Sequence, residues 1–189
     1  MNESPEITTR RLHIIPFAEQ FLTQQYVAWL NDPEVVRYSS QRRRLHTLES
    51  CRSYWQSFSG TPHCFWAIIE EQRGLGHIGN MNAYIDRQDE VADLGILIGN
   101  KAAWHLGYGC EAWLAVCRHL FEREDVRKIT AGTCASNTAM VALMRAAGMA
   151  DDGRRVRQTV VDGREVDIVY AALFRDVWAS TATRVGVSC

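Results

Sequence analysis

The stretch KAAWHLGYGCEAW, residues 101–113, lies between an apolar strand-like segment and a segment with helical periodicity. Two glycines, Gly107 and Gly109, flank Tyr108 where that helix is expected to begin. A helix N-terminus presents about four unpaired N–H groups and a partial positive charge, and glycine there lets an anion approach the backbone. The stretch therefore fits a phosphate-binding loop, and on its letters alone it equally fits a plain turn into a helix.

The same glycines also match a dinucleotide-binding fingerprint, Gly-x-Gly-x-x-Ala, but the context disagrees with it. That fingerprint follows its strand directly, inside a parallel βαβ unit. Here the strand ends near Gly99, several residues earlier. The expected strands over 64–69, 76–85 and 91–99 are joined by short polar turns, which is typical of an antiparallel meander. A nicotinamide-dependent dehydrogenase is therefore disfavoured.

The rest of the chain predicts a mixed arrangement of strands and helices in one domain. We expect a single domain over residues 1–178 and a flexible C-terminal tail over 179–189, where the sequence is small and polar. Further elements are expected as a strand over 8–17, helices over 18–32, 48–58, 108–122 and 138–147, a strand over 127–134, and a hairpin over 154–174 that turns at Asp162–Gly163.

Bulk properties exclude several classes of function. The chain has 189 residues and a formal net charge of −1, so no basic field predicts binding to nucleic acid or to a membrane surface. The first residues lack the layout of a signal peptide, and no apolar run approaches the roughly 18 residues of a membrane span. The six cysteines form no CxxC pair and no metal-like cluster, so we expect reduced thiols in the cytoplasm and no metal site. A monomer and a homodimer remain equally open.

Three segments in order resemble the GCN5-related N-acetyltransferases, the GNAT family. WHLGYGCEA, residues 104–112, resembles that family's coenzyme A loop, [Gln/Arg]-x-x-Gly-x-[Gly/Ala], with His105 as a departure. ADLGILIGNKAAW, residues 92–104, resembles the strand before the loop. CASNTAMVALMRAAGM, residues 134–149, resembles the Asn-containing segment after it. The resemblance covers about residues 8–175 and is nearest to the branch of ribosomal-protein alanine and serine acetyltransferases.

The resemblance implies an α/β (α+β) fold and acetyl-CoA as co-substrate. The expected sheet is mixed but mostly antiparallel, with about six or seven strands, two of them splayed, and about four flanking helices. The pantetheine arm of coenzyme A is expected to insert between the splayed strands like a short extra strand, with one backbone N–H polarising the thioester carbonyl. The residues implied in cofactor binding are Leu97, Ile98, Gly99, His105, Leu106, Gly107, Tyr108, Gly109, Cys110 and Asn137.

Asp93 is the candidate general base. It is a carboxylate in an otherwise apolar strand, and it shares a face with Gly95 and Leu97. Burial beside the acetyl site would raise its pKa and make it a stronger base, and it matches the position of the catalytic Glu in histone acetyltransferases of this family. The competing interpretation is an Asp at the strand edge that pairs with a nearby Arg.

The general acid is less well defined. The resemblance places the family's usual Tyr at Met144 and a Ser used in parts of the branch at Met140. Tyr84, Cys134 and Ser136 are possible substitutes. Because a coenzyme A thiolate is a fair leaving group, a reaction without a dedicated acid is also open.

Acceptor residues are expected on the neighbouring strand and in the N-terminal helical region. Asn80, Asn82 and Tyr84 share one strand face, which either lines the acceptor pocket or is merely solvated. Trp29 and Tyr38 come from the region that shapes the acceptor site in the family. The run QRRR, residues 41–44, either meets an anionic acceptor, such as a nucleotide-linked sugar, or is a solvated loop.

The predicted function is therefore an acetyl-CoA-dependent N-acetyltransferase that works by direct transfer. Compatible acceptors are a protein N-terminal amine, an amino-sugar nucleotide or another small amine. The alternative is a non-catalytic acyl-CoA-binding module of the same fold, which Met140 and Met144 make plausible.

Overall fold

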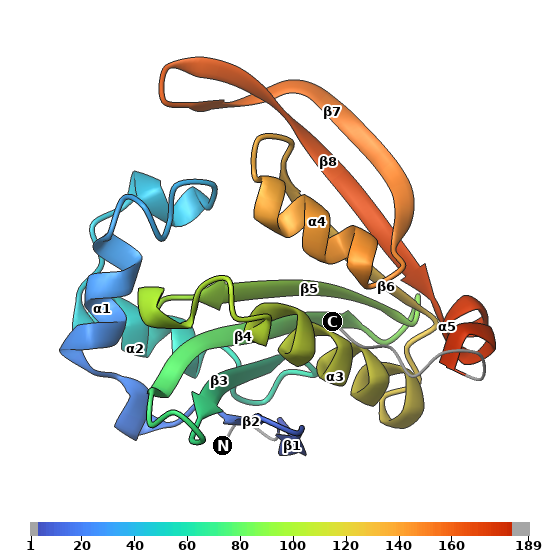
Figure 1. Cartoon of the computed structure of the whole chain (residues 1–189), viewed down its shortest axis with the longest axis horizontal. Helices are drawn as coiled ribbons and strands as arrows, with labels where there is room; N and C mark the ends of the chain where they lie inside the picture. Colours follow the sequence, from blue (N-terminus) through green and yellow to red (C-terminus); the bar gives the residue numbers. More distant parts are fainter. Residues whose placement is uncertain (1–3, 183–189) are drawn as a thin grey trace.

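The computed structural model describes residues 4–182, which form one open eight-stranded sheet with helices on both faces (Figure 1). The strand order across the sheet is β1-β2-β3-β4-β5-β6-β8-β7. The strands are β1 (Ile7–Thr8), β2 (Leu12–Pro16), β3 (Cys64–Glu70), β4 (Gly76–Asp86), β5 (Val91–Ile98), β6 (Lys128–Cys134), β7 (Ala150–Val161) and β8 (Arg164–Phe174). The α-helices are α1 (Gln24–Asn31), α2 (Leu48–Gln56), α3 (Tyr108–Arg123), α4 (Thr138–Ala146) and α5 (Arg175–Ala182), with 3₁₀ turns η1 (Glu19–Phe21), η2 (Ser40–Arg43) and η3 (Lys101–Ala103).

The feature that positions the site is the junction of β5 and β6. Every other neighbouring pair of strands is antiparallel, whereas β5 and β6 run parallel. They pair only where Val91–Asp93 face Lys128–Thr130. Beyond these three positions both strands continue without pairing, so the sheet is split at this point. This confirms the expected splayed pair.

Two apolar cores lie on opposite faces of the sheet. Consecutive residues of β3 alternate between them: Trp66 and Ile68 pack with α3, whereas Phe65 and Ala67 pack with α1 and α2. Side chains that alternate along a strand point to opposite faces. The same alternation places Ala92 and Leu94 in the α3 core, so Asp93 belongs to the face covered by α1 and α2.

The strand count and the helical pattern differ in detail from the expectation. The eighth strand is the two-residue β1, which is too short to give a periodic signal. The segment expected as one helix over 18–32 is broken into η1 and α1, because the side chain of Thr23 caps a new helix at Tyr26 N. A fifth helix, α5, extends to Ala182, past the expected start of the tail at 179; residues 183–189 lie outside the described part.

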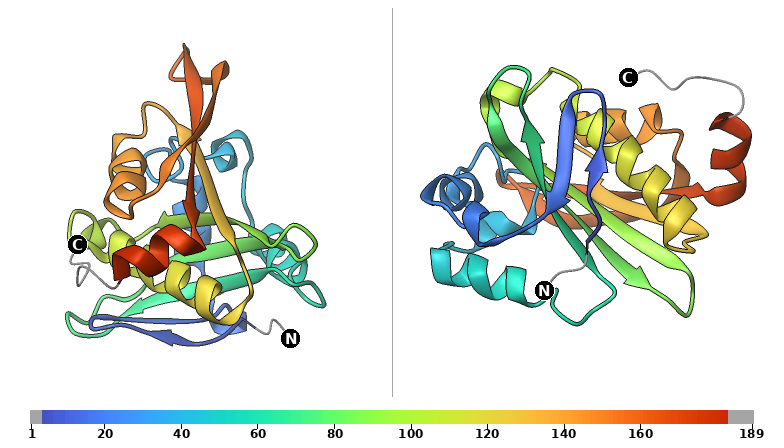
Figure 2. Two further views of the ribbon diagram at one scale, coloured as in Figure 1. Left: turned by 90° about the vertical axis from the view of Figure 1, so that its right-hand side faces the viewer. Right: turned by 90° about the horizontal axis from the view of Figure 1, so that it is seen from below.

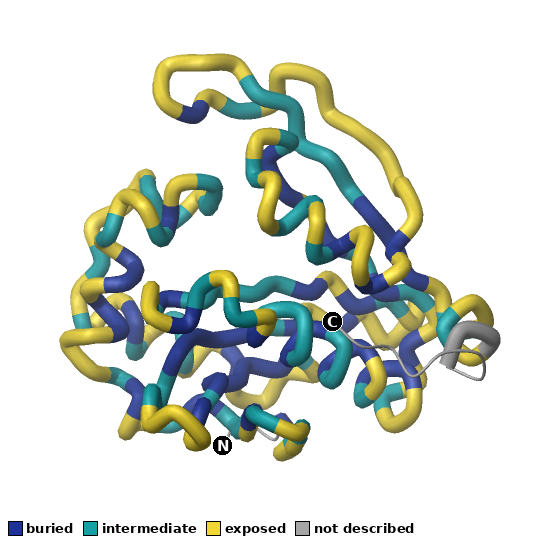
Figure 3. Tube along the Cα trace, viewed as in Figure 1, coloured by how far each residue is buried: buried dark blue, intermediate teal, exposed yellow. Residues whose placement is uncertain are grey.

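Several local signals were predicted correctly. Thr47 caps α2, and Asn137 caps α4 by accepting from Met140 N at 3.2 Å. The β7–β8 hairpin turns at Asp162 and Gly163, whose φ angles of 50° and 76° suit the tight turn that matches strand twist. This hairpin projects from the rest of the chain, and β7 is exposed along most of its length (Figures 2 and 3).

Candidate active site

The N-terminus of α3 has no side-chain cap. Gly107 occupies the cap position with φ 80° and ψ 0°, a left-handed conformation that favours glycine. By contrast, α1, α2 and α4 each begin with a side chain that accepts a backbone N–H, from Thr23, Thr47 and Asn137 respectively. The first N–H groups of the longest helix are therefore left for another acceptor, and the helix dipole favours an anion there.

Gly109 leaves space directly beside these N–H groups. A Cβ at this position would meet nothing closer than 3.7 Å, from Ile98 of β5 and Leu143 of α4. The backbone at Gly109 is helical, and helices disfavour glycine by about 1 kcal/mol relative to alanine. Neither packing nor a left-handed dihedral requires glycine here. We therefore attribute the glycine at this position to the close approach of a bound group to the backbone.

The loop before α3 is tied to β5 and held in a strained conformation. The indole Nε1 of Trp104 donates to the carbonyl of Ile98 at 2.8 Å. His105 has φ 60°, a left-handed value that costs a side-chain-bearing residue about 1–2 kcal/mol. His105 is exposed, so its imidazole points away from the packed part of the loop rather than filling it.

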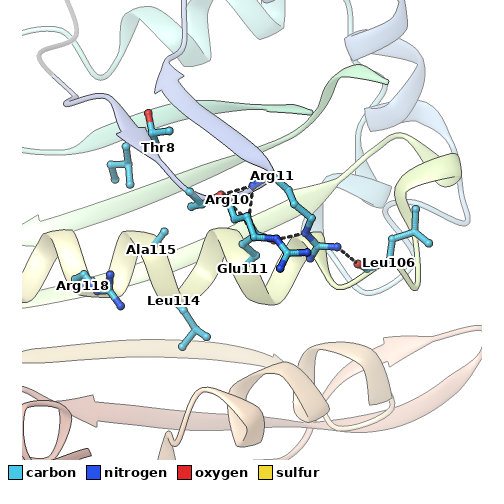
Figure 4. A pocket seen from close by; sticks show the side chains of 10 residues that line it. Thr8, Arg10, Arg11, Leu106, Glu111, Leu114, Ala115 and Arg118 are labelled. Atoms are coloured by element: carbon cyan, nitrogen blue, oxygen red, sulfur yellow. Dashed lines mark hydrogen bonds and ion pairs between the residues drawn. The ribbon is translucent and has the colours of Figure 1, made fainter. Parts of the chain in front are cut away.

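A second anchor holds the loop from the other side, and no short sequence motif indicates it. Arg11, just before β2, donates from Nη1 to the Leu106 carbonyl at 2.9 Å and from Nε to Glu111 Oε2 at 2.5 Å (Figure 4). Its guanidinium lies over the Tyr108 ring, 4.6 Å from the centroid. Thr9 Oγ1 donates to Glu111 Oε1 at 2.6 Å. We call Thr9, Arg11 and Glu111 the loop clamp.

The clamp is an ionised pair in a mostly buried setting. Desolvation raises the pKa of Glu111, but the hydrogen bonds from Thr9 and Arg11 outweigh it, so the pKa lies below the ordinary glutamate value. The side chains of Arg11 and Glu111 are 26% and 17% exposed, so solvent screens the pair only partly. A cavity of about 590 Å³ between the β1–β2 hairpin and α3 is lined by the clamp, by Arg10 and by Arg118 (Figure 4). It lies on the hairpin side of α3, away from the β5–β6 gap.

On β5, the backbone groups of alternate residues face the gap. Gly99 N donates to the carbonyl of Ile78 in β4 at 2.9 Å, so this predicted contact residue already has a partner. Alternation then directs the N–H groups of Ile96 and Ile98 toward β6 and those of Leu97 toward β4. Of the three cofactor-binding residues predicted here, Leu97, Ile98 and Gly99, only Ile98 therefore presents its backbone N–H to the gap.

Asp93 lies where the gap opens. Asp93 and Thr130 are the last paired residues of β5 and β6, and Thr130 Oγ1 donates to Asp93 Oδ2 at 2.8 Å. Asp93 keeps access to solvent, but partial desolvation raises its pKa above the ordinary aspartate value, and the bond from Thr130 opposes that rise. No Arg pairs with Asp93 among the described residues, where its side-chain partner is Thr130.

Asn80, Asn82 and Tyr84 lie on the same face as Asp93. They face Leu97, Gly95 and Asp93 across the β4–β5 ladder. Tyr84 is 40% exposed, and its hydroxyl lies 3.0 Å from the Tyr54 hydroxyl of α2. Asn80 is only 7% exposed, and its Oδ1 has no hydrogen-bond partner among the described residues. The same side chain hydrogen-bonds to Tyr26, so Asn80 is part of a buried polar pair on the face that carries Asp93.

The remaining predicted acceptor residues differ in setting. Trp29 is a core residue, 7% exposed, and its ring lies 2.1 Å from the position that a Cβ on Gly99 would take. Tyr38 is half-buried, and its carbonyl accepts from Cys134 Sγ at 3.5 Å. A cavity of about 120 Å³ opens between α1, η2 and α2; its walls include Tyr26, Arg44, His46, Cys51 and Tyr54.

The segment after β6 provides structure as well as candidates. Asn137 Nδ2 donates to Thr133 Oγ1 at 3.1 Å while its Oδ1 caps α4, so both ends of the amide are engaged. Met144 is 4% exposed and Met140 packs on the same α3 core. These two residues therefore contribute to the core-facing side of α4.

The cysteines divide into two groups. Cys51, Cys64, Cys117 and Cys134 are free and buried, in line with reduced thiols. Cys110 lies in the first turn of α3 and is half-buried. Cys189 lies outside the described residues. Within residues 4–182, no three His, Cys, Asp or Glu side chains gather as a metal site would require. In the same part of the chain, no helix is long and apolar enough to cross a membrane.

Comparison with known proteins agrees with this geometry. The model of the acetyltransferase (GNAT) domain matches residues 11–150. Among solved structures, a GNAT-family acetyltransferase from Bacillus anthracis superposes with a TM-score of 0.77 at 19% identity, covering 91% of this chain and 99% of that one. The ribosomal L7/L12 alpha-N-protein acetyltransferase RimL in complex with coenzyme A gives 0.79 at 15%, covering 90% and 98%.

A third neighbour has a different acceptor. Spermidine N-acetyltransferase from Vibrio cholerae, in complex with coenzyme A and spermine, gives a TM-score of 0.81 at 14% identity, covering 90% of this chain and 99% of that one. No relative was found among the curated protein sequences. The split sheet, the uncapped α3 and the matching domain model define an acyltransferase fold and site. The chain belongs to the GNAT acetyltransferase family.

Proposed function

We propose that this chain is an acetyl-CoA-dependent N-acetyltransferase that transfers acetyl directly to a primary amine. The observation that carries the proposal is the junction of the β5–β6 gap with the uncapped N-terminus of α3, where Gly109 leaves room beside the backbone. The N–H groups of Tyr108, Gly109 and Cys110 suit a pyrophosphate, and the gap suits an extended arm that pairs with β5. RimL and the spermidine enzyme are both known in complex with coenzyme A.

Tyr108 contributes through its backbone alone. Its side chain is 2% exposed, and desolvation together with the nearby Glu70 carboxylate raises its pKa. The phenol is therefore directed into the protein, under Arg11, rather than toward the phosphate position. Asn137 supports the arm indirectly, by holding the start of α4 beside the gap.

Asp93 is proposed as the proton acceptor. In the reaction the amine nitrogen bonds to the acetyl carbonyl carbon, the carbon–sulfur bond breaks, the sulfur leaves with the electron pair as thiolate, and the proton lost by nitrogen passes to the Asp93 carboxylate. A raised pKa makes Asp93 a better base than an ordinary aspartate. The N–H of Ile98, which faces the gap, is proposed to bind the carbonyl oxygen as it gains charge.

No side chain in this proposal serves as a dedicated acid. Met140 and Met144 cannot donate a proton, and the Tyr84 hydroxyl is paired with Tyr54. The thiolate departs into a partly solvated gap, so bulk water can protonate it. Asn80 Oδ1, which is buried and has no hydrogen-bond partner within residues 4–182, is proposed to accept a hydrogen bond from the acceptor substrate.

The test is release of coenzyme A thiol from acetyl-CoA, measured with a panel of primary amines. The proposal expects amine-dependent release by the wild-type chain and a loss of at least 100-fold in kcat for Asp93→Asn. Thr130→Val, which removes the hydroxyl beside Asp93 but keeps the carboxylate, is the matched control and should retain most activity. Tight binding of acetyl-CoA without turnover on any amine would instead support a non-catalytic acyl-CoA-binding module.

A further inference from the structure

Two arginine-rich segments, far apart in sequence, meet on the acceptor side of the sheet. One is residues 37–44, which include η2; the other is residues 154–164, the tip of the β7–β8 hairpin (Figure 1). Arg37 Nη2 binds Asp162 Oδ2 at 2.6 Å, and Arg42 Nη2 donates to the Val160 carbonyl at 2.9 Å. We call the two joined segments the arginine bridge.

The bridge carries more positive charge than the neighbouring acidic groups neutralise. It holds eight arginines. Three of them pair with acids: Arg37 with Asp162, Arg154 with Asp167, and Arg157 with Glu165. The remaining five have no acidic partner among the described residues; they are Arg42, Arg43, Arg44, Arg155 and Arg164. Of the other acids near the hairpin, Asp152 is taken by Lys128, while the Asp151 side chain accepts from Gly153 N.

A chain of contacts connects this charge to the proposed base. The Arg155 guanidinium carbon lies 5.3 Å from the centroid of the Tyr170 ring. That ring covers Gly132 of β6, because a Cβ on Gly132 would lie 2.8 Å from it. Gly132 is two residues, about 7 Å, along β6 from Thr130 on the same face, and Thr130 binds Asp93. Arg155 therefore lies on the face where the acceptor amine must approach.

A second arginine of the bridge borders the small cavity between α1, η2 and α2. Arg44 is exposed and lines that cavity together with Tyr26 and Tyr54. Tyr54 contacts Tyr84, which faces Asp93 across the β4–β5 ladder. Unpaired guanidinium groups thus flank the Asp93 region from both segments of the bridge.

We infer that the arginine bridge selects an acceptor amine that carries an anionic group, a phosphate or a carboxylate. The inference rests on the proposed function and narrows its substrate class. A guanidinium presents a planar fork of donors that matches phosphate and carboxylate oxygens. The same charge repels a cationic polyamine, although a polyamine is the acceptor that the Vibrio cholerae neighbour binds. The acceptor specificity of this chain is therefore opposite in charge to that of this neighbour.

The experiment compares matched amines at constant acetyl-CoA, with kcat/KM as the readout. The pairs are glucosamine 6-phosphate against glucosamine, and a peptide with acidic residues after its N-terminus against the same peptide with the acids replaced by amides; spermidine is the cationic reference. We expect at least one anionic member to exceed its neutral partner by 10-fold or more. A preference in the sugar pair would identify a small phosphate ester as the acceptor, and a preference in the peptide pair would identify an acidic protein N-terminus. The preference should shrink as salt rises from about 50 to 500 mM.

Arg155→Gln tests the bridge itself. This variant should raise KM for the preferred anionic amine about 10-fold while leaving kcat/KM for the neutral amine unchanged. Arg118→Gln, the same charge change on the exposed side of α3, is the matched control and should leave both values unchanged. Arg44→Gln provides a second variant should the hairpin variant fold poorly.

Different results overturn the inferred acceptor class and the proposed function. Equal use of anionic and neutral amines, or efficient use of spermidine, overturns the inference and leaves the proposed function standing. An equal effect of Arg155→Gln on both members of a pair also overturns it. Absence of transfer to every amine overturns the proposed function, and the inference with it.

Discussion

Replacing Arg11 with alanine should weaken coenzyme A binding although Arg11 lies outside the gap. Arg11 fixes the carbonyl of Leu106, and that carbonyl sets the direction of the loop before α3. Without this hydrogen bond, the loop is no longer held on this side, and the strained left-handed conformation of His105 is less well stabilised. The loop would relax, and the N–H groups that face the pyrophosphate would need to be reordered upon binding.

The size of the effect follows from the contacts. Arg11 makes one bond to the Glu111 carboxylate at 2.5 Å, one to the Leu106 carbonyl at 2.9 Å, and a stacking contact on Tyr108. Charged hydrogen bonds contribute about 1.5–3 kcal/mol and an exposed cation–π contact about 0.5–1 kcal/mol. We expect a loss of about 2–4 kcal/mol in the free energy of unfolding. Reordering one or two backbone residues costs about 1–2 kcal/mol each, so the Kd of coenzyme A should rise about 10- to 100-fold.

The assay compares acetyl-CoA with acetyl-pantetheine, which lacks the pyrophosphate. In Arg11→Ala, KM for acetyl-CoA should rise by that factor while KM for acetyl-pantetheine and kcat stay near the wild-type values. The matched control is Arg10→Ala, an exposed arginine that lines the same cavity but makes no side-chain hydrogen bond or ion pair within residues 4–182. The positioning role of Arg11 is refuted if both thioesters lose affinity equally, because a general loss of structure would do that.

Three further predictions address other residues. In Asp93→Asn, kcat should fall about 100- to 10,000-fold and lose its dependence on the Asp93 ionisation, which a pH–rate profile checks. The free energy of unfolding should stay near the wild-type value in chemical denaturation, because Asp93 is exposed and asparagine keeps an oxygen that can accept from Thr130. Desolvation lowers the pKa of His77, which is enclosed by Phe17, Phe21 and Trp29, to about 4. The free energy of unfolding should therefore drop by about 3 kcal/mol as the pH falls from 6.5 to 4, because the unfolded chain takes up the proton first. In urea titrations at several pH values, His77→Leu should make the free energy of unfolding less dependent on pH over this range. Gly109→Ala should keep or gain up to about 1 kcal/mol of stability yet bind coenzyme A at least 10-fold more weakly by calorimetry; an unchanged Kd would mean that the glycine serves no ligand.

Local signals in the sequence predicted most of the fold. The polar caps Thr47 and Asn137, the Asp162–Gly163 turn and the meander of β3, β4 and β5 all depend on neighbouring residues, so they can be identified from short windows. The break at Thr23 was missed because the apolar spacing continues across it. The two-residue β1 forms only by pairing with β2 and has no periodicity of its own.

The site could be predicted in outline, since its glycines and Asp93 are conspicuous in sequence. The contacts that shape it are long-range and could not. Arg11 and Glu111 are 100 residues apart, and the arginine bridge joins positions more than 115 residues apart. The partner of the Gly99 N–H likewise depends on which side of the strand faces β4, and that follows from sheet register.

The most direct test of the central claim is a crystal structure of the wild-type chain with coenzyme A. We expect the pyrophosphate within hydrogen-bond distance of the N–H groups of residues 108–110, the pantetheine arm between β5 and β6 beside Ile98, and the thiol next to Asp93. Coenzyme A bound elsewhere, such as in the cavity between the β1–β2 hairpin and α3, with an empty β5–β6 gap, would contradict it.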